Sequence, residues 1–173
     1  PFGTLTSEAA EAAFYEQMSA LAEGGVDVIW IETIFAFDEL AAAIRAARRT
    51  GLPVVSTMTF DTASRTMMGD TAEKAVEFTH TFEPRLTAFG ANCGAGPSML
   101  IDTVVGLCEA ADEHDVIIAK GNCGIPQMID GEIVYSGTNE VMAEYARLAR
   151  DCGARIIGGC CGTTPERLKA IVE

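Results

Sequence analysis

The feature of this sequence that most restricts its fold is an apolar segment that occurs five times, each time followed by a Gly-rich or polar turn. Each segment is almost continuously apolar rather than alternating, which is typical of parallel strands that are covered on both faces. Amphipathic helical stretches lie between the segments, so the pattern predicts an α/β fold with right-handed crossovers. The predicted strands are residues 26–32, 52–60, 86–92, 115–122 and 154–159.

Four predicted helices have recognisable ends. The residues expected to cap their N-termini are Thr6 or Ser7, Asp38, Ser98, and Thr138 or Asn139. Glycines stand where three of these helices would end and the chain would continue into the next strand: Gly24, Gly51 and Gly153.

Two arrangements of parallel strands compete, an open doubly wound sheet and a closed barrel. An open sheet is expected to carry a Gly-rich phosphate loop after its first strand, and residues 31–39 (IETIFAFDE) contain none. We therefore predict a (β/α)8 TIM barrel, of which this chain supplies the last five βα units as one domain over residues 1–173. Such a barrel typically needs about 250 residues, so roughly three units are expected to be absent from this chain or to lie on another one.

Charge and composition restrict the partners. The net charge is −13, and the longest basic stretch is Arg48-Arg49, which argues against electrostatic binding to nucleic acid or to an anionic membrane. No apolar run approaches the ~20 residues that cross a bilayer, and the N-terminus lacks the features of a signal peptide. We expect a cytoplasmic protein with six reduced cysteines, because disulfide frameworks belong to secreted proteins.

Four of the six cysteines follow predicted strands, where functional residues of parallel α/β folds gather. Cys108 and Cys152 lie instead in or at the end of helices and are expected to be core residues. Thiolates are soft ligands, and Cys93, Cys160 and Cys161 with an open fourth position would suit a catalytic zinc ion. A substrate thiol at that position would lose its proton and become a nucleophile at neutral pH.

The two cysteine motifs resemble the signature of the homocysteine S-methyltransferase family: FGANCGAGP (89–97) and IIGGCCGTTPERLKAI (156–171). Three further segments match family segments in the same order: DVIWIETI (27–34), PVVSTMTFDTASRTMMGDT (53–71) and GNCGIPQMIDGEIVY (121–135). The resemblance implies a zinc-dependent barrel that transfers a methyl group to the thiol of L-homocysteine and forms methionine, as a step of methionine biosynthesis.

The resemblance also implies roles for single residues. Cys93, Cys160 and Cys161 would hold the zinc ion. Glu32 matches a carboxylate that binds the amino group of homocysteine, although an acidic residue there could instead stabilise the following helix through its dipole. Two other predicted substrate-binding residues, Asn92 and Asn122, could equally well serve only to adopt a turn conformation.

Family members often have NAGLP where this chain has residues 122–126, so Cys123 is an additional thiol. It could simply replace alanine or act as a fourth metal ligand in the absence of substrate. Residues 62–73 are most similar to the cobalamin-dependent methionine synthase type. This favours methylcobalamin, carried on another domain or protein, over the other donors of the family, S-methylmethionine and betaine.

Alternatives to this function come from other classes. A redox role for Cys160-Cys161 is disfavoured, because adjacent cysteines form a disulfide only with a strained backbone and no CxxC motif is present. The chain could also be a non-catalytic, zinc-binding partial barrel that a partner chain completes, or it could methylate a different thiol acceptor.

Overall fold

The computed structural model describes residues 3–61 and 63–173. Pro1 and Phe2 lie outside the described residues, as does Thr62, which belongs to the segments 53–71 and 62–73 discussed above. The helices are α1 (Ser7–Glu23), α2 (Phe37–Arg48), α3 (Ala72–Thr79), α4 (Pro97–Ala110), α5 (Asn139–Cys152) and α6 (Pro165–Val172). The strands are β1 (Ile29–Ile34), β2 (Val54–Met58), β3 (Ala88–Cys93), β4 (Ile117–Gly121), β5 (Pro126–Ile129), β6 (Glu132–Tyr135) and β7 (Ile156–Gly159).

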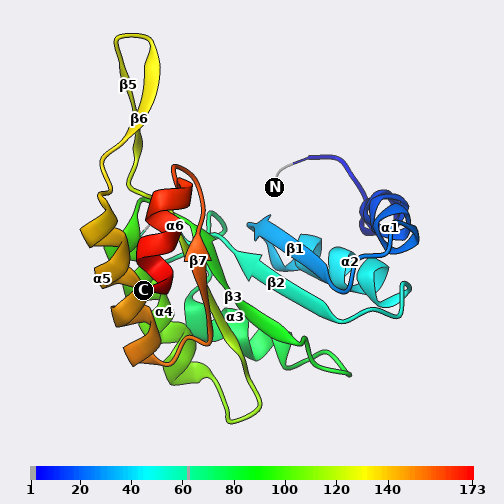
Figure 1. Cartoon of the computed structure of the whole chain (residues 1–173). Helices are drawn as coiled ribbons and strands as arrows, with labels where there is room; N and C mark the ends of the chain where they lie inside the picture. Colours follow the sequence, from blue (N-terminus) through cyan, green and yellow to red (C-terminus); the bar gives the residue numbers. More distant parts are fainter. Residues whose placement is uncertain (1–2, 62) are drawn as a thin grey trace.

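Five strands form one parallel sheet in the order β1-β2-β3-β4-β7, which is also their order along the chain. All five predicted strands are thereby confirmed. Figure 1 shows α1 and α2 beside the β1 end of the sheet, and α5 and α6 beside the β7 end. Within the described ranges, the outer edges of β1 and β7 pair with no further strand. The same ranges contain no helix long and apolar enough to cross a membrane.

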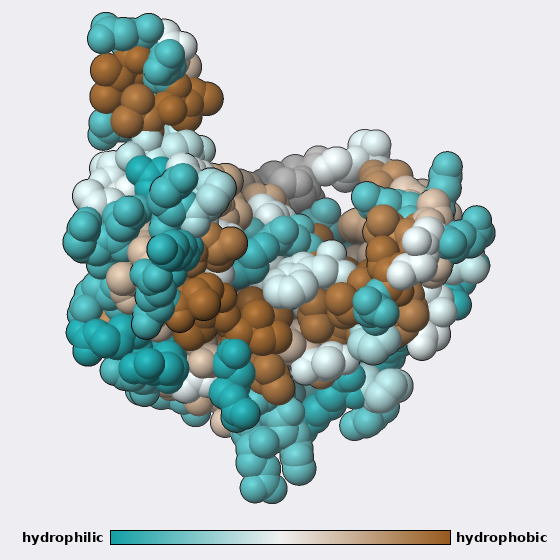
Figure 2. All heavy atoms as spheres, viewed as in Figure 1, coloured by the Kyte–Doolittle hydropathy of each residue, from teal (hydrophilic) through white to brown (hydrophobic). Residues whose placement is uncertain are grey.

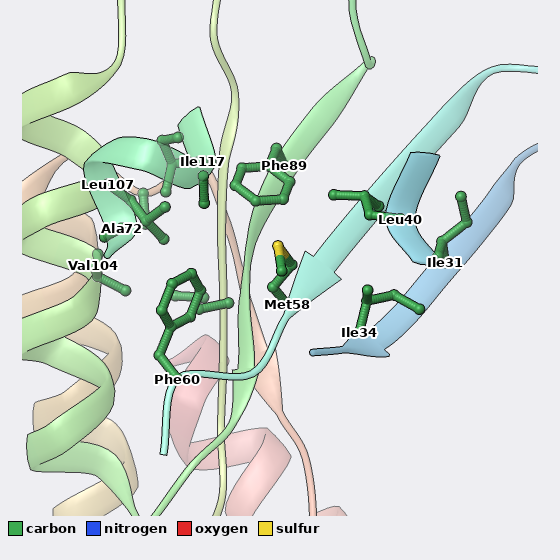
Figure 3. Packing of buried hydrophobic residues seen from close by; sticks show 14 of the residues in the cluster. Ile31, Ile34, Leu40, Met58, Phe60, Ala72, Phe89, Val104, Leu107 and Ile117 are labelled. Atoms are coloured by element: carbon green, nitrogen blue, oxygen red, sulfur yellow. The ribbon is translucent and has the colours of Figure 1, made fainter. Parts of the chain in front are cut away.

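The apolar strand residues form a separate cluster on each face of the sheet. The main core lies between one face and the helices, where Met58, Phe89 and Ile117 from three adjacent strands meet helix residues (Figure 3). Each fully buried side chain of this size contributes about 1.5–3 kcal/mol. Alternate strand residues form a smaller cluster on the opposite face: Val55, Ala88 and Ile118. We call this opposite face the inner face of the sheet.

Two of the predicted helix caps are confirmed and two are wrong. The hydroxyl of Thr6 accepts a hydrogen bond from Ala9 N, and that of Thr138 accepts one from Val141 N. Asp38 and Ser98 instead lie inside the first turns of α2 and α4, because these helices begin two residues earlier than predicted, with Ala36 and Gly96 as their N-caps. The α4 start has a clear reason, since Pro97 fixes a helical φ and has no N–H to leave unpaired.

Of the three glycines at predicted helix ends, two follow their helices directly. Gly24 is the C-cap of α1, and Gly153 ends α5 in the left-handed conformation, at φ 117°. Gly51 lies further on, in the turn beyond Arg48, at φ 75°.

The sequence analysis missed α3, α6 and the hairpin β5–β6. Both helices have only eight residues, too few to show a clear helical period, although Thr71 and Thr164 cap them. The hairpin turns at Asp130-Gly131, where both residues have positive φ, and an Asp-Gly pair between two short segments that contain apolar residues is a strong hairpin signal. Figure 1 shows that it projects from the body of the protein.

Strands β3 and β4 approach so closely that only glycine fits at position 90. A Cβ atom there would lie 1.9 Å from the carbonyl oxygen of Ile118. We expect Gly90→Ala to lower the free energy of unfolding by at least about 1–3 kcal/mol, the usual penalty for overpacking. Gly158→Ala in β7 is the matched control, because its Cβ would meet only Lys120 Cγ at 3.7 Å. Urea unfolding of both variants provides the measurement, and equal losses would contradict this explanation.

Candidate metal centre

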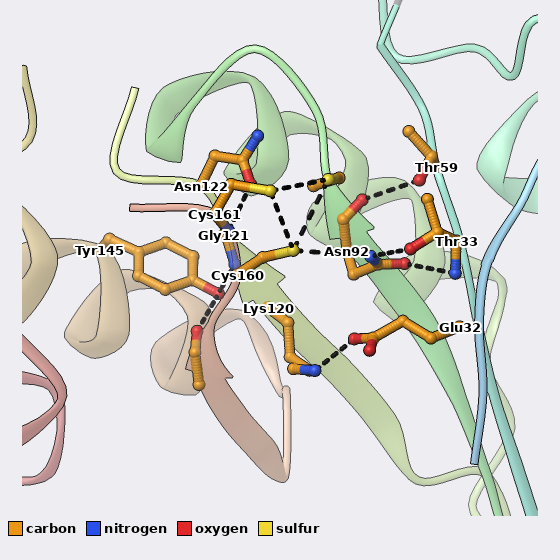
Figure 4. Close-up of polar contacts among 12 residues, drawn as sticks. Glu32, Thr33, Thr59, Asn92, Lys120, Gly121, Asn122, Tyr145, Cys160 and Cys161 are labelled. Carbon is orange, nitrogen blue, oxygen red and sulfur yellow. Dashed lines mark hydrogen bonds and ion pairs between the residues drawn. The ribbon is translucent and has the colours of Figure 1, made fainter. Parts of the chain in front are cut away.

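Three thiols meet where β3 and β7 end. Cys93 is the last residue of β3, and Cys160 and Cys161 directly follow β7. The Sγ–Sγ distances are 3.5 Å for Cys93–Cys160, 3.8 Å for Cys93–Cys161 and 3.9 Å for Cys160–Cys161 (Figure 4). Thiolates bound to zinc at about 2.3 Å with tetrahedral angles lie about 3.8 Å apart. The cluster therefore fits three corners of a zinc tetrahedron, and the cysteines are free rather than disulfide-bonded.

The glycines around the cysteine pair allow a tight turn. A Cβ atom on Gly159 would lie 2.0 Å from Thr163 Oγ1, and one on Gly162 would lie 2.3 Å from Tyr135 Cγ. Gly162 also has a φ of 77°, which favours glycine. The ring of Tyr135, at the end of the hairpin, thus packs directly against the turn that holds the two thiols.

Cys93 also has a left-handed backbone conformation, with a φ of 65°. Such a conformation is strained for a residue with a side chain and persists only where its surroundings fix it. Gly94 continues the turn at φ 75°, and its carbonyl oxygen accepts a hydrogen bond from Asn122 Nδ2 at 2.8 Å. The turn after β3 is thus held by a side chain from the end of β4.

The two asparagines at the strand ends bind the protein itself in this structure. Asn122 Oδ1 accepts a hydrogen bond from Cys161 N at 2.9 Å, so this amide links the turns that carry Cys93 and Cys161. Asn92 is fully buried. Its Nδ2 donates to Thr33 Oγ1 at 2.7 Å and contacts Cys160 Sγ at 3.7 Å. Both amides therefore position the cluster, and their predicted contacts with substrate stay a prediction.

Burial and mutual proximity keep the thiols of Cys93 and Cys161 protonated. Burial, together with the neighbouring thiols of Cys160 and Cys161, raises the pKa of Cys93 to about 12. Burial likewise raises the pKa of Cys161 above its ordinary value. Cys161 is nevertheless exposed by surface area, so the cluster is open on one side. A cation that binds to these thiols must displace their protons. The open side of the cluster leaves room for a further ligand on such a cation.

Glu32, the predicted partner of an amino group, is paired with a lysine. Its Oε1 atom accepts a hydrogen bond from Lys120 Nζ, so the pair connects β1 with β4 (Figure 4). The same ammonium group lies 5.1 Å from the centre of the Trp30 ring. The predicted carboxylate therefore already accepts a hydrogen bond from an ammonium group, that of Lys120.

Cys123 does not belong to the cluster. Its side chain is fully buried, and its Sγ lies 3.4 Å from Thr163 Oγ1. The three thiols that come together are those of Cys93, Cys160 and Cys161, so the structure favours the interpretation in which Cys123 replaces alanine. Cys108 and Cys152 pack against the main core from α4 and α5, as expected.

Two residues of the site escaped the sequence analysis. Lys120 is the one charged residue within β4, and a charge inside an apolar strand needs a partner, which was the available signal. Tyr145 on α5 is buried, accepts a hydrogen bond from Gly121 N at 3.0 Å and donates one to Gly158 O at 3.3 Å. It fixes β4 against β7, and nothing in its local sequence distinguishes it from an ordinary core tyrosine.

A second group of possible metal ligands lies near the N-terminal end of β4, away from the strand ends that carry the thiols: His80, Asp112 and Asp115. Its carboxylates are already in use, because Arg85 pairs with both aspartates and His80 Nε2 lies 2.8 Å from Asp115 Oδ2. This group is explained as an ion-pair network.

A model of the homocysteine S-methyltransferase family matches residues 1–173. The apo form of the homocysteine methyltransferase MmuM from Escherichia coli has a TM-score of 0.78 and 21% identity, and the match covers 96% of this chain and 56% of that one. The metallated form of MmuM has a TM-score of 0.78 and 22% identity, covering 98% and 52%. The chain thus spans about half the length of these structures. The likeness shows that its fold is part of a TIM barrel, as predicted.

We expect the protein to bind one zinc ion, and Cys93→Ser, Cys160→Ser and Cys161→Ser each to weaken binding by more than roughly 100-fold. Removing a residue that only hydrogen-bonds to a metal ligand already lowers metal affinity 10–100-fold. Cys123→Ala is the control and should retain stoichiometric zinc, since its thiol lies outside the cluster. Zinc content after dialysis against a graded chelator measures the difference. Full zinc retention by the Cys160 and Cys161 variants would exclude this site.

Zinc affinity should rise with pH. The raised pKa values of Cys93 and Cys161 mean that both thiols are protonated in the metal-free protein near neutral pH, whereas metal-bound cysteines are thiolates. Binding therefore releases protons and is favoured when protons are scarce. Competition titrations between about pH 6 and pH 8 should show steadily tighter binding. An affinity independent of pH would contradict thiol ligation.

Proposed function

Because the chain belongs to the homocysteine S-methyltransferase family, we propose that it transfers a methyl group to the thiol of L-homocysteine and forms methionine. The observation that carries the proposal is the cluster of three thiols at zinc spacing, at the strand ends where active sites of TIM barrels lie. In the transfer, the bond between the methyl group and its donor breaks, a new bond to the homocysteine sulfur forms, and the thiol proton leaves to solvent.

We propose that Cys93, Cys160 and Cys161 hold the zinc ion. A bound zinc ion lowers the pKa of a coordinated thiol, so that a sulfur nucleophile is available at neutral pH. Asn122 and Asn92 keep the ligands at their spacing, since one binds the turn of Cys161 and the other contacts Cys160. The exposed side of the cluster at Cys161 would admit the substrate sulfur.

We propose Glu32 as the group that binds the amino group of homocysteine. In the structure its carboxylate already accepts a hydrogen bond from an ammonium group, that of Lys120. An ammonium–carboxylate contact of this kind is a charge-assisted hydrogen bond, which is roughly twice as strong as a neutral one. Direct contacts of Asn92 and Asn122 with substrate are a further part of the proposal.

The proposed donor is methylcobalamin, held by another domain or protein, as the similarity of residues 62–73 suggests. The described part of this segment, 63–73, follows β2 on the side of the sheet where the strands end. A donor carried by a partner could approach the C-terminal ends of the strands there.

The test is methionine formation from homocysteine with each of three donors in turn: methylcobalamin, S-methylmethionine and betaine. We expect activity with zinc, loss of activity after chelation, and recovery when zinc is restored. Glu32→Gln should weaken homocysteine binding by about 10-fold or more, since a charged hydrogen bond contributes about 1.5–3 kcal/mol. Glu140→Gln, on the exposed start of α5, is a matched control that should leave binding unchanged. Methyl transfer that persists without metal would overturn the proposal.

A further inference from the structure

We propose that Lys120 binds the α-carboxylate of the amino-acid substrate, so that Glu32 and Lys120 together receive its zwitterionic head group. This inference rests on the proposed function and adds to it the residue that would select amino acids among thiols. In the structure the two side chains pair with each other. A zwitterion offers each of them a new partner of the right sign.

The position of Lys120 on the sheet suits this role. In the strand register Lys120 pairs with Asn92 on β3 and with Gly158 on β7. Cys160 lies two residues beyond Gly158, which places the thiol cluster about 7 Å further along the strands. Homocysteine separates its sulfur from its α-carbon by two methylene groups. A molecule whose sulfur lies at the cluster can therefore present its head group near the ion pair.

The inner face is open on one side of the lysine. Its register partner Gly158 has no side chain, and a Cβ atom there would meet only Lys120 Cγ, at 3.7 Å. The Lys120 side chain can therefore shift towards β7 without meeting a side chain at position 158.

The exchange of partners balances the charges. The ammonium group of the substrate replaces that of Lys120 at Glu32, and its carboxylate binds the released lysine, so one ion pair becomes two. The Glu32 and Lys120 side chains are 38% and 23% exposed, so water can solvate both charges while they exchange partners. The long, flexible lysine chain can move without a change in the backbone.

A purely structural role for the ion pair makes different predictions. If Lys120 only connects β1 with β4, its removal lowers the stability of the protein and lowers the affinity for every ligand equally. If it binds the carboxylate, its removal lowers the affinity only for ligands that carry a carboxylate. A ligand with an amino group alone should bind as tightly or more tightly, because it no longer competes with the lysine for Glu32.

The experiment compares wild type, Lys120→Met and Lys120→Arg as zinc-loaded proteins, with binding measured by calorimetry. The ligands are homocysteine, aminopropanethiol, which lacks the carboxylate, and mercaptobutyrate, which lacks the amino group. We expect Lys120→Met to lower the affinity for homocysteine and mercaptobutyrate by about 10–100-fold, the range for a charged hydrogen bond. The affinity for aminopropanethiol should not fall. Lys120→Arg should retain most of the homocysteine affinity. Lys169→Met, at a 73% exposed side chain on α6, is the control and should match wild type.

The protein contains a single tryptophan, Trp30, whose ring lies beside Lys120. Homocysteine should therefore change the tryptophan fluorescence of zinc-loaded wild type, and this change should disappear in Lys120→Met. Equal weakening of all three ligands by Lys120→Met, or no weakening of any, would overturn the role of Lys120 while leaving homocysteine binding intact. Failure of the zinc-loaded wild type to bind homocysteine would instead overturn the proposed function, and the role of Lys120 with it.

Discussion

The site depends on the register of three parallel strands. Cys93 on β3 pairs with Gly121 on β4, which in turn pairs with Gly159 on β7. The outer two strands are therefore about 10 Å apart, twice the spacing of neighbouring strands. The thiols bridge this gap because Cys93 turns at a positive φ and because Cys160 follows the end of β7. A slip of one residue in either pairing would turn a side chain to the opposite face and dissolve the cluster.

Polar side chains fix this register at the strand ends. Asn122 connects the turn after β3 with the turn after β7, and Tyr145 connects the backbones of β4 and β7 from the helical side. These groups are buried, so an unmade hydrogen bond among them would be expensive. The turns that carry the three thiols are thereby held in place by the fold, as preorganised binding of a metal would require.

The side chains of the inner face change from apolar to polar along the strands. Deep in the sheet it is apolar, with Val55, Ala88 and Ile118. Nearer the strand ends it carries the pair of Glu32 and Lys120, and the thiols lie at the rim. The ion pair therefore lies between the apolar part of the inner face and the thiol cluster at the strand ends. Figure 2 shows apolar and polar side chains side by side in the hollow between the two ends of the sheet.

The sequence by itself determined the five strands, their parallel arrangement and the family, because continuous apolar segments and two cysteine motifs are local patterns. It also indicated which cysteines stand at strand ends. Only the tertiary structure decided that Cys93 and Cys160 lie 3.5 Å apart while Cys123 points elsewhere, since this depends on register and turn conformation across three strands. The partnership of Glu32 with Lys120 was equally hidden, because the two residues are 88 positions apart and meet only when the sheet has formed.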